Sequence, residues 1–566
     1  MTKQVASGID TDMDIDPRGE PLMSYTLPAV RETPSAEPRT IYSVASGDLR
    51  LSANTKCWPT QEAFEGDVAR AASGLGWSVK RAHGVDPEKG HGFIDSQRLG
   101  IEVFRGIPKD APVVVVDAVW QYSHHVLAGL RSHEGPILIV ANWAGDFPGL
   151  VGLLNLTGSL TKAGISYSSL WSKDFTDDWA IGKFEEWLST GSITHDTSHV
   201  RDLPALDESS EEVELGRALA RELLEDKAII GIFDEGCMGM YNAIVDDELL
   251  NAIGIYKERL SQSALLAEMN RVSDDEAAAA KTWLDEAGLT FHFGEDEETE
   301  LTPAQVHSQL KMYIAALRMG DDFGVDAIGI QYQQGLKDMV PASDLAEGLL
   351  NNVSRPPVRS RDGGRELYAG APLPHFNEVD EGVAVDALIT NRSWTAMGLD
   401  PANTLHDVRW GEEYDGEFVW VFEISGSVPA SHNGGYDKSY SMRQPAMFFP
   451  LGGGTLSGVS KPGEIVWSRV FVEGGELHVD LGRGHVVDLP AEETQRRLDA
   501  TDPQWPIMHA VLDGVSRDQM MARHKANHAQ VVYAPDAETA DKAVLAKAAF
   551  FAELGVHVHL AGDVSI

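Results

Sequence analysis

Short apolar runs alternate with amphipathic segments along the first two thirds of the chain. Four runs are apolar throughout, as in strands buried on both faces of a parallel sheet: 113–116, 137–141, 229–233 and 327–330. Amphipathic helical segments lie between them: 61–75, 211–224, 260–270 and 303–318. This alternation predicts α/β layers, with ligand clefts beyond the carboxyl ends of the strands.

The pattern changes after about residue 391. Segments 417–423, 464–472 and 476–488 alternate or are rich in β-branched residues, and Gly474-Gly475 marks a turn between two of them. Such segments are typical of antiparallel strands. The last part of the chain returns to helices and ends near a strand at 556–560.

We therefore expect an α/β fold with two Rossmann-like α/β domains followed by an antiparallel-β-rich C-terminal domain. The first domain is expected over 41–225, the second over 226–393 and the third over 394–566. The acidic, proline-containing stretch 203–212 and the loop 352–370 favour these divisions.

Composition narrows the possible partners. The chain has 46 Lys and Arg against 87 Asp and Glu, a net charge of −41, which argues against binding to nucleic acid or an anionic membrane. Only Cys57 and Cys237 are present, too few for a disulfide framework. Residues 1–40 are polar and lack the apolar region of a signal peptide, so we expect a disordered or extended tail. No apolar run reaches the roughly 18 residues of a membrane helix, and a cytoplasmic location is expected.

Common nucleotide and hydrolase motifs are missing from the chain. It contains no G-x-x-x-x-G-K-[ST], no strand-linked G-x-G-x-x-G and no G-x-S-x-G. Three polar clusters remain where strands would aim side chains into a cleft: 375–382, 406–410 and 525–530. A carboxylate from each of the first two and an imidazole from the third would suit Mn²⁺ or Mg²⁺ better than a thiolate-preferring metal.

The same clusters resemble the metal-binding region of the L-fucose isomerase family. In that family a Glu opens an E-x-D motif and an Asp-Val-Arg follows, as Glu378-Val379-Asp380 and Asp407-Val408-Arg409 do here. The segments LDATDPQWP (498–506) and Ala526-Asn527-His528 are similar to the family's T-D-P-x-W-P and G-A-N-H motifs. Shorter matches occur in the family's order: 119–122, 237–240, 330–333, 425–427 and 452–454.

The resemblance implies that Glu378, Asp407 and His528 bind a divalent cation, Mn²⁺ or alternatively Mg²⁺ or a relative. Glu378 and Asp407 would also transfer protons. It also implies residues that line a sugar pocket: Trp120, Met238, Gln331, Ser425, Thr455 and Asn527. In the family, the first domain of a neighbouring subunit completes the pocket. We therefore expect a homo-oligomer, a hexamer or trimer, with Trp120 acting in the neighbour's pocket.

The expected function is a metal-dependent aldose–ketose isomerase that interconverts a neutral aldose, such as L-fucose or D-arabinose, and its ketose through a cis-enediol. The chain departs from the family pattern in the spacing of Glu378 and Asp407, which is a few residues longer, and at two further places. Residues 529–535 replace a glycine-containing continuation, and Thr455 stands where an aromatic residue commonly follows three glycines. These departures leave open a metal-dependent sugar epimerase or lyase on the same scaffold, or a sugar-binding protein without catalysis.

Overall fold

The computed structural model describes residues 34–565, so most of the tail expected over 1–40 lies outside the described residues.

The first sheet is parallel and doubly wound. Five strands have the order β2-β1-β3-β4-β5: β1 (Thr40–Val44), β2 (Ser78–Arg81), β3 (Val113–Asp117), β4 (Ile137–Asn142) and β5 (Ser168–Ser172). Five helices connect or follow them: α1 (Leu51–Gly74), α2 (Gln97–Arg105), α3 (Ser123–Arg131), α4 (Gly149–Ala163) and α5 (Asp178–Thr190). In a sheet with this strand order, the loops after β1 and β3 lead to opposite faces of the sheet and leave a crevice between them. Open α/β sheets generally bind ligands in such a crevice.

A second parallel sheet has three strands in the order β10-β7-β8. They are β7 (Ala228–Phe233), β8 (Ile255–Leu260) and β10 (Ala327–Ile330). The helices of this part are α6 (Glu211–Asp226), α7 (Asp247–Ala252), α8 (Gln262–Met269), α9 (Asp274–Glu286), α10 (Pro303–Phe323) and α11 (Asp344–Leu350). A short strand here, β9 (Thr290–Phe291), pairs with β13 (Tyr440–Ser441) from the C-terminal part.

The C-terminal antiparallel strands close into a barrel. Hydrogen bonds link β14-β17-β11-β12-β16-β15, and β14 also pairs with β15. The strands are β11 (Asn403–Tyr414), β12 (Glu417–Glu423), β14 (Gly463–Glu473), β15 (Glu476–Val486), β16 (Ile507–Leu512) and β17 (His528–Ala534). Gly474 and Gly475 both have positive φ, +61° and +82°, as a tight hairpin turn requires. Four helices pack beside the strands or follow them: α12 (Glu381–Ala396), α13 (Ala491–Asp499), α14 (Arg517–Arg523) and α15 (Ala537–Glu553).

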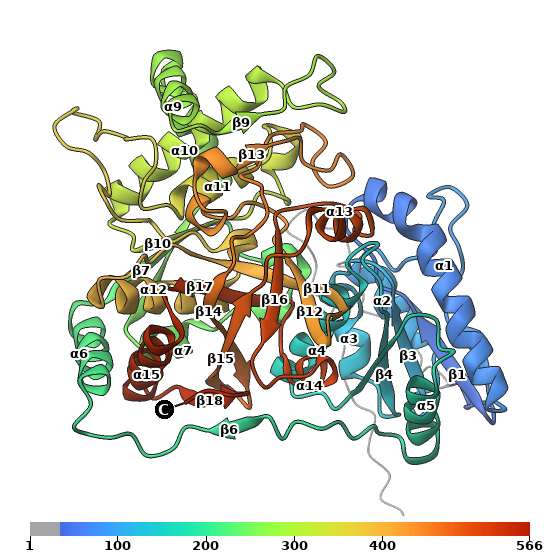
Figure 1. Cartoon of the computed structure of the whole chain (residues 1–566). Coiled ribbons are helices and arrows are strands. Elements are labelled where there is room, and N and C mark those ends of the chain that lie inside the picture. The colour runs from blue at the N-terminus through green and yellow to red at the C-terminus, as the bar shows by residue number, and fades with distance from the viewer. Residues whose placement is uncertain (1–33, 566) are drawn as a thin grey trace, which may run out of the picture.

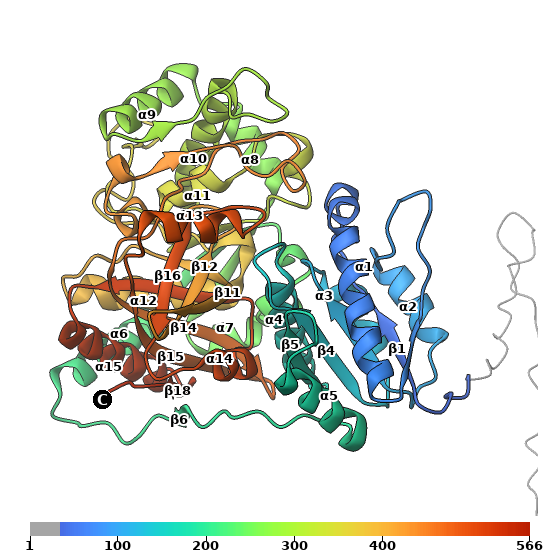
Figure 2. The same cartoon turned by 45° about the vertical axis from the view of Figure 1, so that its right-hand side comes forward.

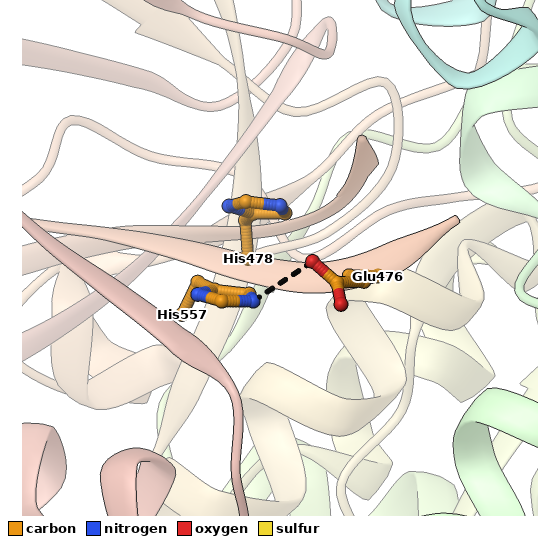
Figure 3. Close-up of side chains that lie close together, drawn as sticks. All are labelled: Glu476, His478 and His557. Atoms are coloured by element: carbon orange, nitrogen blue, oxygen red, sulfur yellow. Dashed lines mark hydrogen bonds and ion pairs between the residues drawn. The ribbon is translucent and has the colours of Figure 1, made fainter. Parts of the chain in front are cut away.

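Two further strands extend the barrel sheet at β15. Strand β18 (His557–Ala561) runs parallel to β15, and β6 (Val200–Asp202) runs antiparallel to β18. The connection from the first sheet to the second therefore crosses the barrel, along the lower edge of both views (Figures 1 and 2), and α6 packs against α15. Glu476 and His478 on β15 lie beside His557 on β18 (Figure 3). The domain limits expected at 225 and 393 stay predictions.

The mixed α/β class is confirmed, with parallel sheets first and an antiparallel sheet in the C-terminal part. The largest difference concerns α1, which begins at Leu51, ten residues before the expected helix at 61. Pro59 lies inside α1, where proline is ordinarily unfavourable by about 3 kcal/mol. Burial of Cys57 and Trp58 against the core favours the longer helix. Within residues 34–565, no helix combines the length and apolar character needed to cross a bilayer.

A buried ion pair joins α12 to α15. Lys547 Nζ lies 2.5 Å from Asp386 Oδ1, and both side chains are completely buried. The same ammonium donates to Thr390 Oγ1 at 2.8 Å and to Ser468 Oγ at 2.7 Å, so all three of its hydrogens are directed to partners. Burial lowers the pKa of Lys547, and the Asp386 carboxylate opposes that shift.

Replacing Lys547 by Met should leave the Asp386 charge buried without a cation. We expect the free energy of unfolding in urea to fall by about 3–5 kcal/mol. The matched control is Lys542→Met on the same helix, because Lys542 pairs with Glu538 at 2.7 Å in solvent. That exposed pair should contribute less than about 1 kcal/mol. Equal losses in the two variants would contradict the role assigned to Lys547.

Candidate functional site

A pocket lies where loops at the carboxyl ends of both parallel sheets meet the barrel. Arg50 follows β1 and Trp120 follows β3, so the first sheet contributes to the pocket the crevice between its β1 and β3 loops. The second sheet contributes residues after β7 and β10, and the barrel contributes the rest. The lining consists of Arg50, Trp120, Pro148, Val151, Met238, Gln333, Glu378, Asp407, Ser425, Phe448, Phe449, Trp505 and Asn527. The pocket is narrow, since its empty space of about 400 Å³ includes the open mouth.

Glu378 is presented by a tight turn in front of α12. Glu378 and Val379 both have positive φ, 55° and 58°, a region that residues with a β-carbon seldom adopt. Such conformations cost of the order of 1–3 kcal/mol each and cluster at functional sites. The turn leaves the Glu378 carboxylate buried at the pocket wall, where Ser425 Oγ donates to Oε1 at 3.1 Å.

Asp407 and His528 are brought together by strand register. They lie directly opposite each other in the antiparallel ladder between β11 and β17. Side chains opposite each other in such a ladder have β-carbons about 4.5–5.5 Å apart. His528 Nε2 lies 3.5 Å from Asp407 Oδ1 and 3.9 Å from Glu378 Oε2, so one ring nitrogen faces both carboxylates.

The other nitrogen of His528 is held by Asp380. Asp380 Oδ2 lies 2.8 Å from His528 Nδ1 and 2.6 Å from an Arg469 guanidinium nitrogen, while Oδ1 caps α12 by accepting from Val383 N. A carboxylate at Nδ1 keeps a proton there and leaves the Nε2 lone pair free in the neutral ring. This is the arrangement that orients metal-binding histidines in proteins.

Burial sets the charge balance of the site. It raises the pKa of Glu378 to about 7, with Asp407 adding to the shift and His528 opposing it. Burial also raises the pKa of Asp407. Burial alone would raise the pKa of Asp380, but Arg469 and His528 outweigh it and hold that pKa well below its usual range. Asp380 is therefore a fixed anion, whereas the two pocket carboxylates are costly to ionise together.

The donor set fits a divalent cation. Asp407 Oδ1 is buried and has no hydrogen-bond partner, and the Nε2 of His528 faces only carboxylates. Two carboxylates and one oriented imidazole suit Mn²⁺ or Mg²⁺.

Four of the six residues expected to bind substrate line the pocket: Trp120, Met238, Ser425 and Asn527. The indole nitrogen of Trp120 and the amide oxygen of Asn527 are buried without hydrogen-bond partners. Trp120 lines the same pocket as Glu378 of its own chain, because the β1/β3 crevice faces the barrel. The expectation that a neighbouring subunit completes the pocket stays a prediction, as does the oligomeric state.

The other two residues, Gln331 and Thr455, do not line the pocket. Gln331 is fully buried directly after β10, and its side-chain oxygen accepts from Gln334 N, so Gln333 reaches the pocket instead. The Thr455 hydroxyl bonds to Ser427 Oγ and to the carbonyl of Gly426. Both side chains therefore support loops behind the wall.

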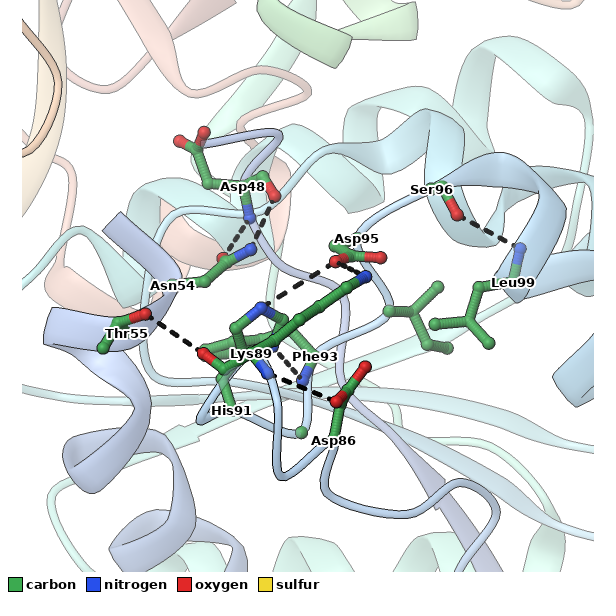
Figure 4. Close-up of polar contacts among 12 residues, drawn as sticks. Asp48, Asn54, Thr55, Asp86, Lys89, His91, Phe93, Asp95, Ser96 and Leu99 are labelled. Carbon is green, nitrogen blue, oxygen red and sulfur yellow. Dashed lines mark hydrogen bonds and ion pairs between the residues drawn. The ribbon is translucent and has the colours of Figure 1, made fainter. Parts of the chain in front are cut away.

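Sequence reasoning missed Arg50 and the aromatic wall. The Arg50 guanidinium binds both oxygens of Asp48, at 2.8 and 2.6 Å, and lies 4.5 Å from the centre of the Phe448 ring. Asn54 holds the Asp48 backbone by two hydrogen bonds of 2.8 Å (Figure 4). The position of Arg50 after the first strand was a usable signal, because clefts form there. Phe448 and Phe449 lie in a loop with no strand pattern.

Comparison with known proteins leaves the family undecided. No family model and no curated protein matches the chain. Among solved structures, the chain is similar to a transcriptional regulator CelR–cellobiose complex, with 14% identity over 54% of this chain and 72% of that chain. The TM-score is 0.15. Similarity at this level supports no conclusion about fold or function.

Proposed function

We propose that the chain is a metal-dependent aldose–ketose isomerase of the L-fucose isomerase type that acts on a small neutral sugar. The observation that carries the proposal is the pair of buried carboxylates, Glu378 and Asp407, both within 4 Å of the same nitrogen of His528 in a narrow pocket. The two parallel sheets followed by a barrel support the expected layout of two Rossmann-like domains and a β-rich domain.

The reaction moves a proton between C1 and C2 of an open-chain sugar through a cis-enediol. A Mn²⁺ ion or a relative, held by Glu378, Asp407 and His528, would supply Lewis acidity to the sugar oxygens. One carboxylate takes the proton from C2, the other supplies a proton to C1, and the hydroxyl proton of O2 passes to O1; the two carboxylates exchange roles in the reverse direction. Ser425 holds one oxygen of Glu378 by a hydrogen bond and so orients the carboxylate.

The walls of the pocket favour a neutral substrate. Trp120, Phe448 and Trp505 offer apolar faces that exclude water and pack against C–H groups of a sugar. The unpartnered polar atoms of Trp120 and Asn527 are available to hydroxyl groups. Arg50 is already neutralised by Asp48, so the pocket presents no unpaired cation to a phosphate or carboxylate.

Glu378→Gln and Asp407→Asn should each abolish turnover, because removing a positioned acid or base costs about 10²–10⁴ in rate and metal affinity falls as well. The assay is proton NMR of L-fucose, D-arabinose and other aldoses in D₂O with enzyme and Mn²⁺. Formation of a ketose that carries deuterium at one carbon identifies an isomerase. Formation of the second epimer with deuterium at the inverted carbon identifies an epimerase, and a spectrum in which the sugar stays unconverted identifies sugar binding without catalysis. Full activity of Glu378→Gln after metal stripping would refute the mechanism.

The matched control for these variants is Glu381→Gln. Glu381 is an equally buried carboxylate three residues from Glu378, but it pairs with Lys257 at 2.7 Å instead of facing His528. Turnover by Glu381→Gln should therefore stay close to that of the unmodified chain. Loss of activity in this variant as severe as in Glu378→Gln would indicate a structural cause for both.

Asp380→Asn should weaken Mn²⁺ binding by about 10–100-fold, because an amide holds His528 in the metal-binding orientation less firmly than a carboxylate. Titration of the metal-stripped protein with Mn²⁺, followed by electron paramagnetic resonance, measures the change. Glu381→Gln again serves as the control and should bind Mn²⁺ normally. Unchanged affinity in Asp380→Asn would remove Asp380 from the site.

A further inference from the structure

Three histidines and three carboxylates lie on the neighbouring strands β15, β18 and β6, away from the pocket. In the parallel ladder of β15 and β18, His478 lies opposite His557 and Asp480 lies opposite His559. His557 and His559 are two residues apart on a strand, so their side chains share one face. Glu476 opens β15 on the same side (Figure 3).

Three of these groups are within reach of a single ion. One ligand atom each from Glu476, His478 and His557 lies within 4.8 Å of the others. His557 Nε2 and Glu476 Oε2 are 3.0 Å apart, and the rings of His478 and His557 are stacked with centroids at 4.7 Å.

A hydrogen-bonded relay orients His478. Asp202 Oδ1 lies 3.0 Å from His559 Nδ1, and His559 Nε2 lies 3.1 Å from His478 Nδ1. A proton on His559 Nδ1 leaves its Nε2 as the acceptor for the His478 Nδ1 proton. With the proton on Nδ1, the Nε2 atom of His478 is the unprotonated ring nitrogen. The surface site thus has the carboxylate-supported imidazole that metal ligands in proteins use.

We propose that Glu476, His478 and His557 bind a late first-row divalent cation, with Zn²⁺ as the representative ion. Two imidazoles and one carboxylate form a known zinc ligand set that leaves a position for water. The ion would join β15 to β18 and, through the His559 relay, to β6. It would therefore fasten the connection between the two parallel sheets to the barrel.

This site differs from the pocket in place and in donors. None of its residues lines the pocket. The pocket trio has two carboxylates and one imidazole, which suits Mn²⁺ or Mg²⁺, whereas the surface trio has the reverse proportion and suits Zn²⁺. The inference does not rest on the proposed isomerase activity.

The test titrates the untagged, metal-stripped full chain with Zn²⁺ alone, by calorimetry. The unmodified chain should bind one equivalent of Zn²⁺ that His557→Gln and Glu476→Gln lose or bind at least tenfold more weakly. The Glu476 side chain is 67% exposed, so its replacement leaves the core intact. Asp407→Asn should keep this equivalent, which separates the surface site from the pocket.

The matched control is His485→Gln. His485 is on the same strand and lies 3.1 Å from Asp513, but it is not part of the three-residue cluster. This variant should bind Zn²⁺ like the unmodified chain. The proposal is overturned if His557→Gln and Glu476→Gln both keep the equivalent, or if His485→Gln loses it to the same degree.

Asp202→Asn examines the relay. Asp202 is 91% exposed and touches no proposed ligand directly, so a change in Zn²⁺ affinity reports on the orientation of His478. We expect about tenfold weaker binding, the lower end of the usual effect of a supporting carboxylate. Unchanged affinity would remove Asp202 and His559 from the site.

Discussion

The Asp380 carboxylate is the contact on which the candidate site depends. One oxygen caps α12, and the other binds both Arg469 from β14 and His528 from β17. A helix and two barrel strands are therefore joined by one buried anion. Because Arg469 keeps Asp380 ionised, His528 has a fixed acceptor on one side and a free nitrogen on the other. Removing that charge would loosen the start of α12, the contact with β14 and the proposed metal ligand His528 together.

The positions of the other site residues follow from where the two parallel sheets and the barrel meet. Loops at the carboxyl ends of two parallel sheets bring Trp120 and Met238 to one end of the barrel, where Glu378 and Asp407 lie. No single layer provides both carboxylates and the apolar wall. The strained turn at Glu378 is sustained by this surrounding packing.

The sequence predicted the layers better than the site. Apolar runs and amphipathic helices indicated the parallel strands, since each signal is local. The pairing of Asp407 with His528 was not predictable from such signals, because strand register across more than a hundred residues is set by the whole barrel. The three polar clusters indicated a mixed carboxylate and imidazole site, but only the family resemblance named these two residues within them. It also named Gln331, whereas the glutamine that lines the pocket is Gln333, a placement that depends on the turn after β10.

Burial explains why similar groups suit different ions at the two proposed sites. In the pocket, two carboxylates are buried together, and burial, with Asp407 adding to it, raises the pKa of Glu378. A divalent cation directly offsets the cost of ionising these buried groups, so carboxylates are useful ligands there. At the surface, solvent already stabilises Glu476, and a carboxylate gains less from the ion. Affinity there must come from imidazoles held with free lone pairs, which is what the Asp202–His559–His478 relay provides.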